Sequence, residues 1–323
     1  MGLNNKERTM SMDKEKQQLS IEVARLYYQS SFSQQEIAEK LNVSRPTISR
    51  LLQYAKEKGY VQITIFDPFS DLFEIEKKLK EKYGLTEVHV AFSPDPNYNS
   101  ISEYLTSCAA EYLEETIKNG DIVGVSWGTT MHKTVSKMSR LDVKGVEVVQ
   151  LKGGIAYFDV NNYAFQTITL LAEQLNTKAR TFPLPVILDS KKAKDLVVKD
   201  RHISKVIELG RQANIAVFTV GTVQSESLHF RLGYFTEQEE TSLKGNAVGD
   251  ICSRFFDKDG QISDQEINSR TIGIELDELK TKEKSILIAG GDRKIKAIHG
   301  ALVGGYANVL LIDKFTAMKL LQH

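Results

Sequence analysis

From about residue 86 to the end of the chain, short apolar segments alternate with longer amphipathic ones. Strands and helices that follow one another in this way are typical of an α/β fold with a mostly parallel, doubly wound sheet. We therefore predict one Rossmann-like domain over residues 86–323. The expected strands are 87–92, 121–127, 146–151, 184–188, 215–221, 271–276, 285–291 and 308–313. The expected helices are 101–118, 129–139, 163–176, 191–210 and 292–303.

The clearest candidate site residues follow the expected strand 121–127. In doubly wound sheets, ligands bind outside the carboxyl ends of the strands. Gly128, Thr129 and Thr130 lie there, at the start of an expected helix. Glycine lets the backbone approach an anion, hydroxyls donate, and a helix N-terminus adds positive potential. These residues predict a phosphate cradle, although a simple helix cap would explain them too.

Three further strands end in comparable residues. These are Lys152, Gly153 and Gly154 after 146–151, Gly221 and Thr222 at the end of 215–221, and Lys294 after 285–291. Considered singly, each is better explained as a turn or a solvated lysine. Because the carboxyl ends of parallel strands meet at one edge of a sheet, the four strand ends together favour a site for a small anionic ligand.

Asp250 and Arg254 lie in the stretch AVGDICSRFFDKDG. A buried pair of this kind is either structural or holds sugar hydroxyls or phosphate, and the sequence leaves both open. The six histidines show no metal-ligand spacing, so we expect no metal. The two cysteines, Cys108 and Cys252, are far apart, which favours a reducing compartment over a disulfide framework.

Residues 16–66 predict a helix-turn-helix module. Ser33 and Glu36 form a capping box ahead of a short helix, and Ser44 can cap the next helix, with Pro46 in its first turn. The stretch KGYVQITIF then predicts a glycine stop and an alternating strand. An ordinary three-helix core with solvated charges remains the competing interpretation.

Helix-turn-helix modules place the start of the second helix in the major groove of DNA. Residues 1–66 carry ten Lys and Arg against seven Asp and Glu, a mild basic excess. Arginine can contact guanine with two hydrogen bonds, and Ser and Thr reach base edges or phosphates. The candidate DNA-binding residues are Gln34, Gln35, Ser44, Arg45, Thr47, Ser49 and Arg50.

Residues 67–85 predict a linker helix. It is equally well explained as a spacer packed on the following domain or as a dimerising element, because such modules usually bind two half-sites as a dimer. The polar residues 1–15 predict a disordered extension. No apolar run is long enough to span a membrane, and the N-terminus lacks a signal-peptide pattern, so we expect a cytoplasmic protein.

Five stretches occur together in one order: FSQQEIAEKLNVSRPTISRLLQYAKEKGYVQI, GVSWGTT, VVQLKGG, AVGDICSRFFDKDG and AGGDRKIKAIHGAL. Jointly they resemble the sorbitol-operon-regulator (SorC) family of bacterial transcription factors, over nearly the whole chain after about residue 15. The resemblance implies a DNA-binding domain joined to a sugar-phosphate-binding domain related to sugar-phosphate isomerases and deaminases. It also implies a tetramer. The isomerases' catalytic residues are not recognisable here, which favours a ligand-sensing regulator over an enzyme.

The details YVQI, VSWGTTM, VEVVQLKGGI and RFFD resemble family members that control deoxyribonucleoside catabolism. This implies a repressor induced by deoxyribose 5-phosphate, with the phosphate on Gly128–Thr130 and Lys294. Lys152, at the end of an apolar strand, could form a Schiff base with the open-chain aldehyde. It could instead be a noncovalent contact or a solvated turn residue. The alternatives are a regulator of the same family for another sugar phosphate, or an isomerase or aldolase fused to a DNA-binding module.

Overall fold

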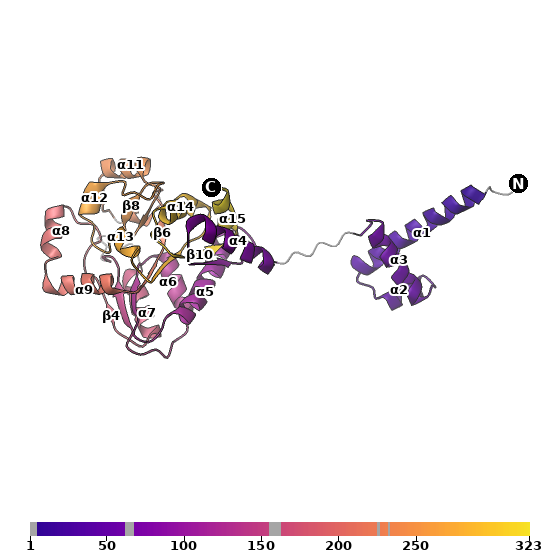
Figure 1. The fold of residues 1–323 in the computed structure, drawn as a ribbon, viewed down its shortest axis with the longest axis horizontal. Helices are drawn as coiled ribbons and strands as arrows, with labels where there is room; N and C mark the ends of the chain where they lie inside the picture. The colour runs from indigo at the N-terminus through magenta and orange to yellow at the C-terminus, as the bar shows by residue number, and fades with distance from the viewer. Residues whose placement is uncertain (1–4, 62–67, 155–162, 225–226, 232) are drawn as a thin grey trace. The chain divides into compact units, whose positions relative to one another are not determined.

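The computed structural model describes residues 5–61, 68–154, 163–224, 227–231 and 233–323. The chain divides into two compact units, one up to Asp67 and one from Pro68 onward (Figure 1). Among the described residues, no helix is both long and apolar enough to cross a lipid bilayer.

The first unit is a three-helix module. Its helices are α1 (Asn5–Tyr28), α2 (Gln34–Lys40) and α3 (Arg45–Glu57). The capping box of Ser33 and Glu36 is present at the start of α2, as predicted. The apolar stripes of the three helices meet in one small core, which includes Val23, Ile37, Ile48, Leu52 and Ala55.

The start of α1 differs from the sequence prediction. We expected residues 1–15 to be disordered, but α1 begins at Asn5 and runs without a break to Tyr28. Residues 5–15 are polar, yet they include good helix formers such as Lys, Glu, Arg and Met and contain neither Gly nor Pro. Most of the strand expected after α3, residues 62–66, lies outside the described residues.

The second unit is built on a parallel sheet of seven strands, in the order β1-β10-β9-β5-β2-β3-β4. The strands are β1 (Glu87–Ala91), β2 (Ile122–Val125), β3 (Glu147–Gln150), β4 (Ala179–Arg180), β5 (Ile215–Phe218), β9 (Lys284–Ile288) and β10 (Val309–Asp313). A small antiparallel sheet joins β6 (Val220–Gly221), β7 (Gly249–Ile251) and β8 (Arg254–Phe256). The predicted fold class is confirmed.

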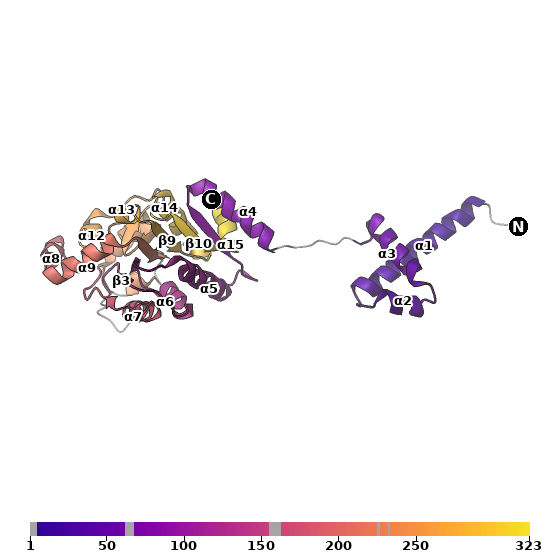
Figure 2. The same cartoon turned by 60° about the horizontal axis from the view of Figure 1, so that its bottom comes forward.

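Helices cover both faces of the large sheet (Figure 2). One face carries α5 (Tyr98–Thr116), α6 (Thr129–Lys137) and α7 (Ala164–Gln174). The other carries α4 (Pro68–Tyr83), α9 (Arg201–Gln212), α14 (Ile295–Val303) and α15 (Lys314–Gln322). The remaining helices are α8 (Lys191–Val197), α10 (Leu228–Arg231), α11 (Glu237–Asn246), α12 (Gln265–Ser269), α13 (Leu276–Leu279) and the short 3₁₀ helix η1 (Asp292–Lys294).

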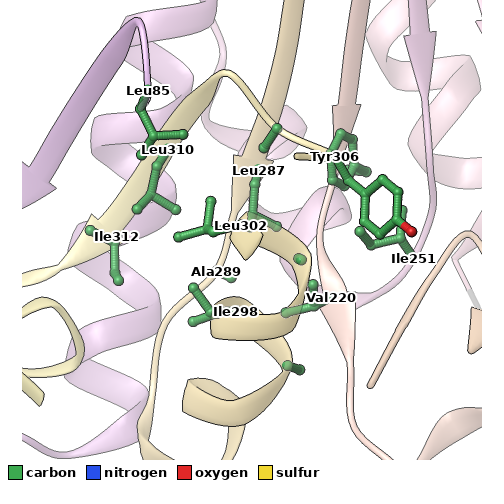
Figure 3. Close-up of a cluster of buried hydrophobic side chains, with 14 of the residues drawn as sticks. Leu85, Val220, Ile251, Leu287, Ala289, Ile298, Leu302, Tyr306, Leu310 and Ile312 are labelled. Carbon is green, nitrogen blue, oxygen red and sulfur yellow. The ribbon is translucent and has the colours of Figure 1, made fainter. Parts of the chain in front are cut away.

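Burial on both faces explains why the strands are continuously apolar. In β10, Val309 and Leu311 pack with α5 on one side, while Leu310 and Ile312 pack with α14 and α15 on the other. Figure 3 shows the cluster on the side of α14 and α15, where Leu310 and Ile312 lie near Ile298 of α14. All of these side chains are fully buried.

Two expected strands are absent from the large sheet. Residues 184–188 and 271–276 are joined by one isolated bridge, between Ile187 and Thr271, and Gly273 forms another bridge with Lys152. They are apolar because side chains such as Val186 and Ile272 are buried. The expected helix 191–210 is two helices, because Asp200 caps the start of α9 through its side chain.

The linker helix predicted at 67–85 is α4, and it belongs to the second unit. Leu72 and Leu79 are buried in the same cluster as Ala317 of α15. The side chain of Glu76 accepts a hydrogen bond from the backbone of Val90 at 2.8 Å. Within this chain α4 is therefore a packed part of the ligand domain, as the spacer interpretation expected.

The strand order also predicts where a ligand-binding crevice lies. The chain moves from β2 to β3 and β4 in one direction, then returns to place β5 on the other side of β2. In a doubly wound sheet, ligands bind at such a reversal, outside the carboxyl ends of the two strands. The residues after β2 and β5 are therefore the first to consider.

Candidate effector site and nucleic-acid interface

Lys152 lies two residues beyond the end of β3 and is almost completely buried, with 4% of its surface exposed. Its Nζ lies 3.8 Å from the centre of the Trp127 ring and 3.4 Å from Oγ of Ser253. Burial lowers the pKa of Lys152, and the nearby charge of Asp250 partly opposes this. A cation over an indole face is stabilised, but loss of solvent favours the neutral amine.

Lys294 is the second amine of the site. It ends η1, is partly buried, and its Nζ lies 3.2 Å from Oγ1 of Thr219, just beyond β5. Burial lowers its pKa to about 8, and again the charge of Asp250 acts in the opposite direction. Asp250 thus acts electrostatically on both lysines, which places one carboxylate among two amines.

Asp250 lies in β7 and is 2% exposed. Its Oδ2 accepts a hydrogen bond from the backbone N–H of Ser253 at 2.9 Å. Gly221 pairs with Asp250 in the small sheet, and a Cβ on Gly221 would collide with the Asp250 carboxylate. Gly221 therefore makes room for a protein carboxylate, which differs from the expected approach of a ligand to its backbone.

A cavity of about 530 Å³ opens beside Lys294. Its walls include Tyr98, Thr222, Gly291 and Arg293. The hydroxyl of Tyr98 is hydrogen-bonded to the side chain of Thr130, so the Gly-Thr-Thr loop contacts one wall residue of this cavity. The volume suits a small ligand such as a sugar phosphate.

The Gly128–Thr130 loop lies between β2 and α6. Gly128 takes a φ of 136°, and no atom lies within 4 Å of a Cβ built on it. It precedes α6, and Thr129 at the start of that helix is exposed. An exposed helix start with free space before it can accept a phosphate oxygen.

Three sequence-predicted residues have other roles. A Cβ on Gly153 would meet the carbonyls of Leu184 and Pro185, and one on Gly154 would meet the side chain of Gln150. These two glycines allow close packing of the chain on itself. A ligand contact is not needed to explain either of them.

Arg254 is the third, and the structure does not bring it to the two lysines. It is fully buried and pairs with Glu275 at 2.7 Å. Its guanidinium donates to the backbone carbonyls of Ile274, Gly273 and Thr271, and also to Asn268. The structural interpretation of this arginine holds, because it fastens the segment 268–275.

Sequence reasoning missed several residues near the amines. The ring of Trp127 contacts Lys152, and its Nε1 donates to the Gly153 carbonyl at 2.7 Å. Ser253 and Tyr98 carried no sequence signal. Neighbouring Ser126 is buried, and within the described part of the chain its Oγ has no hydrogen-bond partner.

A second cavity, of about 510 Å³, lies between α9 and residues 272–275. Its charged groups include Lys194, Glu275 and Arg211, and these already pair with neighbours. Its wall includes Gly273, which pairs with the backbone of Lys152, but neither Lys152 nor Lys294 is among the described residues that line it. We therefore assign the candidate site to the strand ends.

The candidate DNA-binding residues gather at the starts of α2 and α3. Arg45, Ser49 and Arg50 are exposed on α3. The Ser44 side chain caps α3 by accepting from the Thr47 backbone, and the two hydroxyls lie 2.8 Å apart. Gln34 is half-buried, and Gln35 is exposed and donates to Glu39. The exposed start of α3 is thus a candidate surface for a DNA groove.

Comparisons with known proteins follow the same division of the chain. Residues 67–322 match a family model described as “Putative sugar-binding domain”. Residues 24–67 match a model described as “MarR family”. The two matched ranges meet near the boundary between the two units.

Curated relatives match over nearly the full length. The chain is 62% identical over 309 residues to the “Deoxyribonucleoside regulator” of Bacillus subtilis (strain 168), which covers 96% of this chain and 99% of the relative. It is 29% identical over 307 residues to the “Sorbitol operon regulator” of Klebsiella pneumoniae, covering 94% and 98%.

Solved structures agree. The full-length sorbitol operon regulator SorC from Klebsiella pneumoniae matches with a TM-score of 0.73 and 29% identity, over 94% of this chain and 98% of that one. A transcriptional regulator from Streptococcus pneumoniae TIGR4 matches with a TM-score of 0.74 and 27% identity, over 79% and 98%.

A helix-turn-helix module joined to a sugar-binding α/β domain defines a DNA-binding transcriptional regulator that responds to a small sugar ligand. The chain belongs to the SorC family of such regulators. Its relatives are named as regulators, which confirms the expectation of a ligand-sensing protein and not an enzyme.

Proposed function

We propose that this regulator represses a deoxyribonucleoside catabolic operon and that deoxyribose 5-phosphate is its inducer. The observation that carries the proposal is the buried, desolvated amine of Lys152 at the ligand end of the sheet. The name of the relative at 62% identity supports the same operon class.

The phosphate of the inducer binds at the Gly128–Thr130 loop and Lys294. The open space at Gly128 and the exposed start of α6 support this placement. Lys294 supplies a positive charge below a pH of about 8. Thr222, on the wall of the same cavity, offers a hydroxyl.

The aldehyde of the open-chain sugar condenses with Lys152 to form a Schiff base. Only a neutral amine is nucleophilic, and burial lowers the pKa of this one. Covalent capture selects an aldehyde over ketoses and cyclic sugars. The indole of Trp127 and the hydroxyl of Ser253 support the proposal because they hold the amine in one place.

The inducer can change operator affinity only if it binds one arrangement of the protein more tightly than another. We propose that this arrangement belongs to a tetramer whose helix-turn-helix modules act in pairs on operator half-sites. Cross-linking and light scattering with and without the sugar would test both the tetramer and its change.

Borohydride trapping tests the covalent step. Protein is incubated with deoxyribose 5-phosphate, reduced, digested and analysed by mass spectrometry. We expect one adduct, on the peptide that contains Lys152, and none in Lys152→Ala. The matched control is Lys205→Ala, an exposed lysine on α9. Equal trapping in Lys152→Ala would contradict the assignment.

A thermal-shift panel of sugar phosphates tests the ligand. A ligand that binds only the folded state raises stability, by about 2.7 kcal/mol at a concentration a hundred times its Kd. We expect the largest shift with deoxyribose 5-phosphate. A shift with another sugar phosphate and none with this one would favour a noncovalent sensor of that other ligand.

A further inference from the structure

The turn that carries Ser253 has an unusual backbone. Cys252 and Ser253 form the two-residue turn between β7 and β8, with φ angles of 51° and 67°. Two-residue hairpin turns with positive φ at both positions normally use Asn and Gly. Left-handed backbone is costly for other residues and is retained at functional sites.

What this turn holds is the amine of Lys152. Ser253 places its Oγ 3.4 Å from Nζ of Lys152 and its N–H 2.9 Å from Oδ2 of Asp250. One residue thus contacts both the amine and the carboxylate. Trp127 closes another side of the amine, with its ring 3.8 Å away.

The charged groups around the amine leave one acceptor for a proton. Besides Asp250, the titratable group whose charge acts on Lys152 is Cys252. Burial raises the pKa of Cys252 to about 11, so its thiol stays neutral near pH 7. Among the described groups that act on Lys152, the anion is Asp250.

We propose that Asp250 moves the protons of Schiff-base formation at Lys152, and that Ser253 is the positioning residue that holds the amine for it. This inference rests on the proposed covalent capture and adds the residues that make it fast. General acid–base catalysis by a placed side chain contributes about 10²–10⁴-fold in rate.

The step balances without any further reagent. Asp250 takes a proton from the Lys152 ammonium, and the neutral amine attacks the aldehyde carbon. The carbonyl electron pair goes to oxygen, and a proton moves from nitrogen to oxygen to give a carbinolamine. Asp250 returns its proton to this hydroxyl, the C–O bond breaks, and water leaves as the C=N bond forms. One ammonium and one aldehyde become one iminium and one water.

The test is the rate of adduct formation, measured by reducing samples with borohydride at timed intervals after mixing with deoxyribose 5-phosphate. Asp250→Asn keeps the shape and an acceptor oxygen for the Ser253 N–H, but removes the base. We expect adduct formation to slow about a hundredfold. Ser253→Ala should slow it several-fold.

The matched control for the lost charge is Asp277→Asn, whose side chain is 87% exposed. It should keep the wild-type rate. Because Asp250 is buried, Asp250→Ala with added formate provides a second readout. Restoration of the rate by formate supports the proton role, since a purely structural carboxylate would not act from solution.

The two proposals fail differently. A wild-type rate in Asp250→Asn, with the adduct still on Lys152, would overturn the proton role and leave covalent capture standing. No adduct in the wild type, together with a thermal shift by the sugar phosphate, would overturn both covalent capture and this inference.

Discussion

At the scale of single residues, the Asp250 carboxylate fits where it does because residue 221 is a glycine. Gly221→Ala places a methyl group against the Asp250 carboxylate. We expect it to lower the free energy of unfolding by about 1–3 kcal/mol, as overpacking does, and to weaken the response to the sugar phosphate. Chemical denaturation and thermal shift measure the two effects.

The control for this substitution is Gly245→Ala. Gly245 lies in α11, and no atom lies within 4 Å of a Cβ built on it. Alanine in a helix is about 0.5–1 kcal/mol more favourable than glycine, so this variant should be slightly stabilised. Equal stabilisation of both variants would contradict the close contact at Gly221.

The lowered pKa of Lys294 predicts that the affinity for a sugar phosphate depends on pH. Its pKa of about 8 lies below the usual value for lysine, so the amine is charged below that pH and neutral above it. A sugar phosphate stays dianionic in this range, because its second pKa is about 6. We expect its Kd to rise about tenfold between pH 7 and pH 9 as the charge-assisted contact is lost.

Calorimetry in a Lys152→Ala background isolates this effect, because the covalent step has its own pH dependence. Adding Lys294→Met should weaken binding at pH 7 and remove the pH dependence. The same tenfold change in the double variant would show that another group is responsible.

Residue identity alone predicted much of this site but not the partners of each residue. The strand-end rule expected Lys152 and Lys294 at one edge of the sheet, and in the structure the charge of Asp250 acts on both lysines. It could not tell that Arg254 faces the segment 268–275, because that depends on how a long loop folds back. Nor could it place Trp127 under Lys152, because a strand-end indole looks like any core residue.

At the scale of elements, α3 carries the prediction for DNA. Arg50→Ala removes an exposed guanidinium from its outer face. We expect operator binding to weaken by about 1–3 kcal/mol, roughly five- to 150-fold, in a mobility-shift assay at fixed salt. Arg201→Ala, an exposed arginine on α9, should leave operator affinity unchanged. Equal affinity of the Arg50 variant and wild type would contradict a role in binding.

The packing of α4 makes a prediction about stability. Leu79 is fully buried against the ligand domain. Leu79→Ala should lower the free energy of unfolding of that domain by about 2–5 kcal/mol, measured by denaturation followed by circular dichroism. The neighbouring exposed Lys78→Ala should change it by less than about 0.5 kcal/mol. A small effect at Leu79 would mean that α4 is a loosely held linker.

Elements were predicted best where burial is symmetrical. The strands of the large sheet read as continuous apolar runs because both faces are covered. Residues 184–188 and 271–276 are similarly apolar but are joined to each other by one isolated bridge. Composition reports burial, and it does not distinguish a ladder of strand hydrogen bonds from single bridges.

At the scale of the whole molecule, the sugar ligand and the operator DNA must change each other's binding affinity by the same factor. If deoxyribose 5-phosphate lowers operator affinity by some factor, operator DNA lowers sugar affinity by the same factor at equilibrium. We expect a factor of about 5–150, the usual range for such coupling. Calorimetric titration of the sugar with and without saturating operator measures it. An unchanged sugar affinity alongside released DNA would contradict a repressor induced by this ligand.

The chain contains a single tryptophan, and that residue is Trp127. Its indole lies directly against the amine on which the proposed chemistry depends. The tryptophan fluorescence of the protein therefore comes from one indole, which lies beside Lys152. Conversion of that amine to an iminium can be followed in real time in unlabelled protein, on operator DNA or off it, by emission at one wavelength.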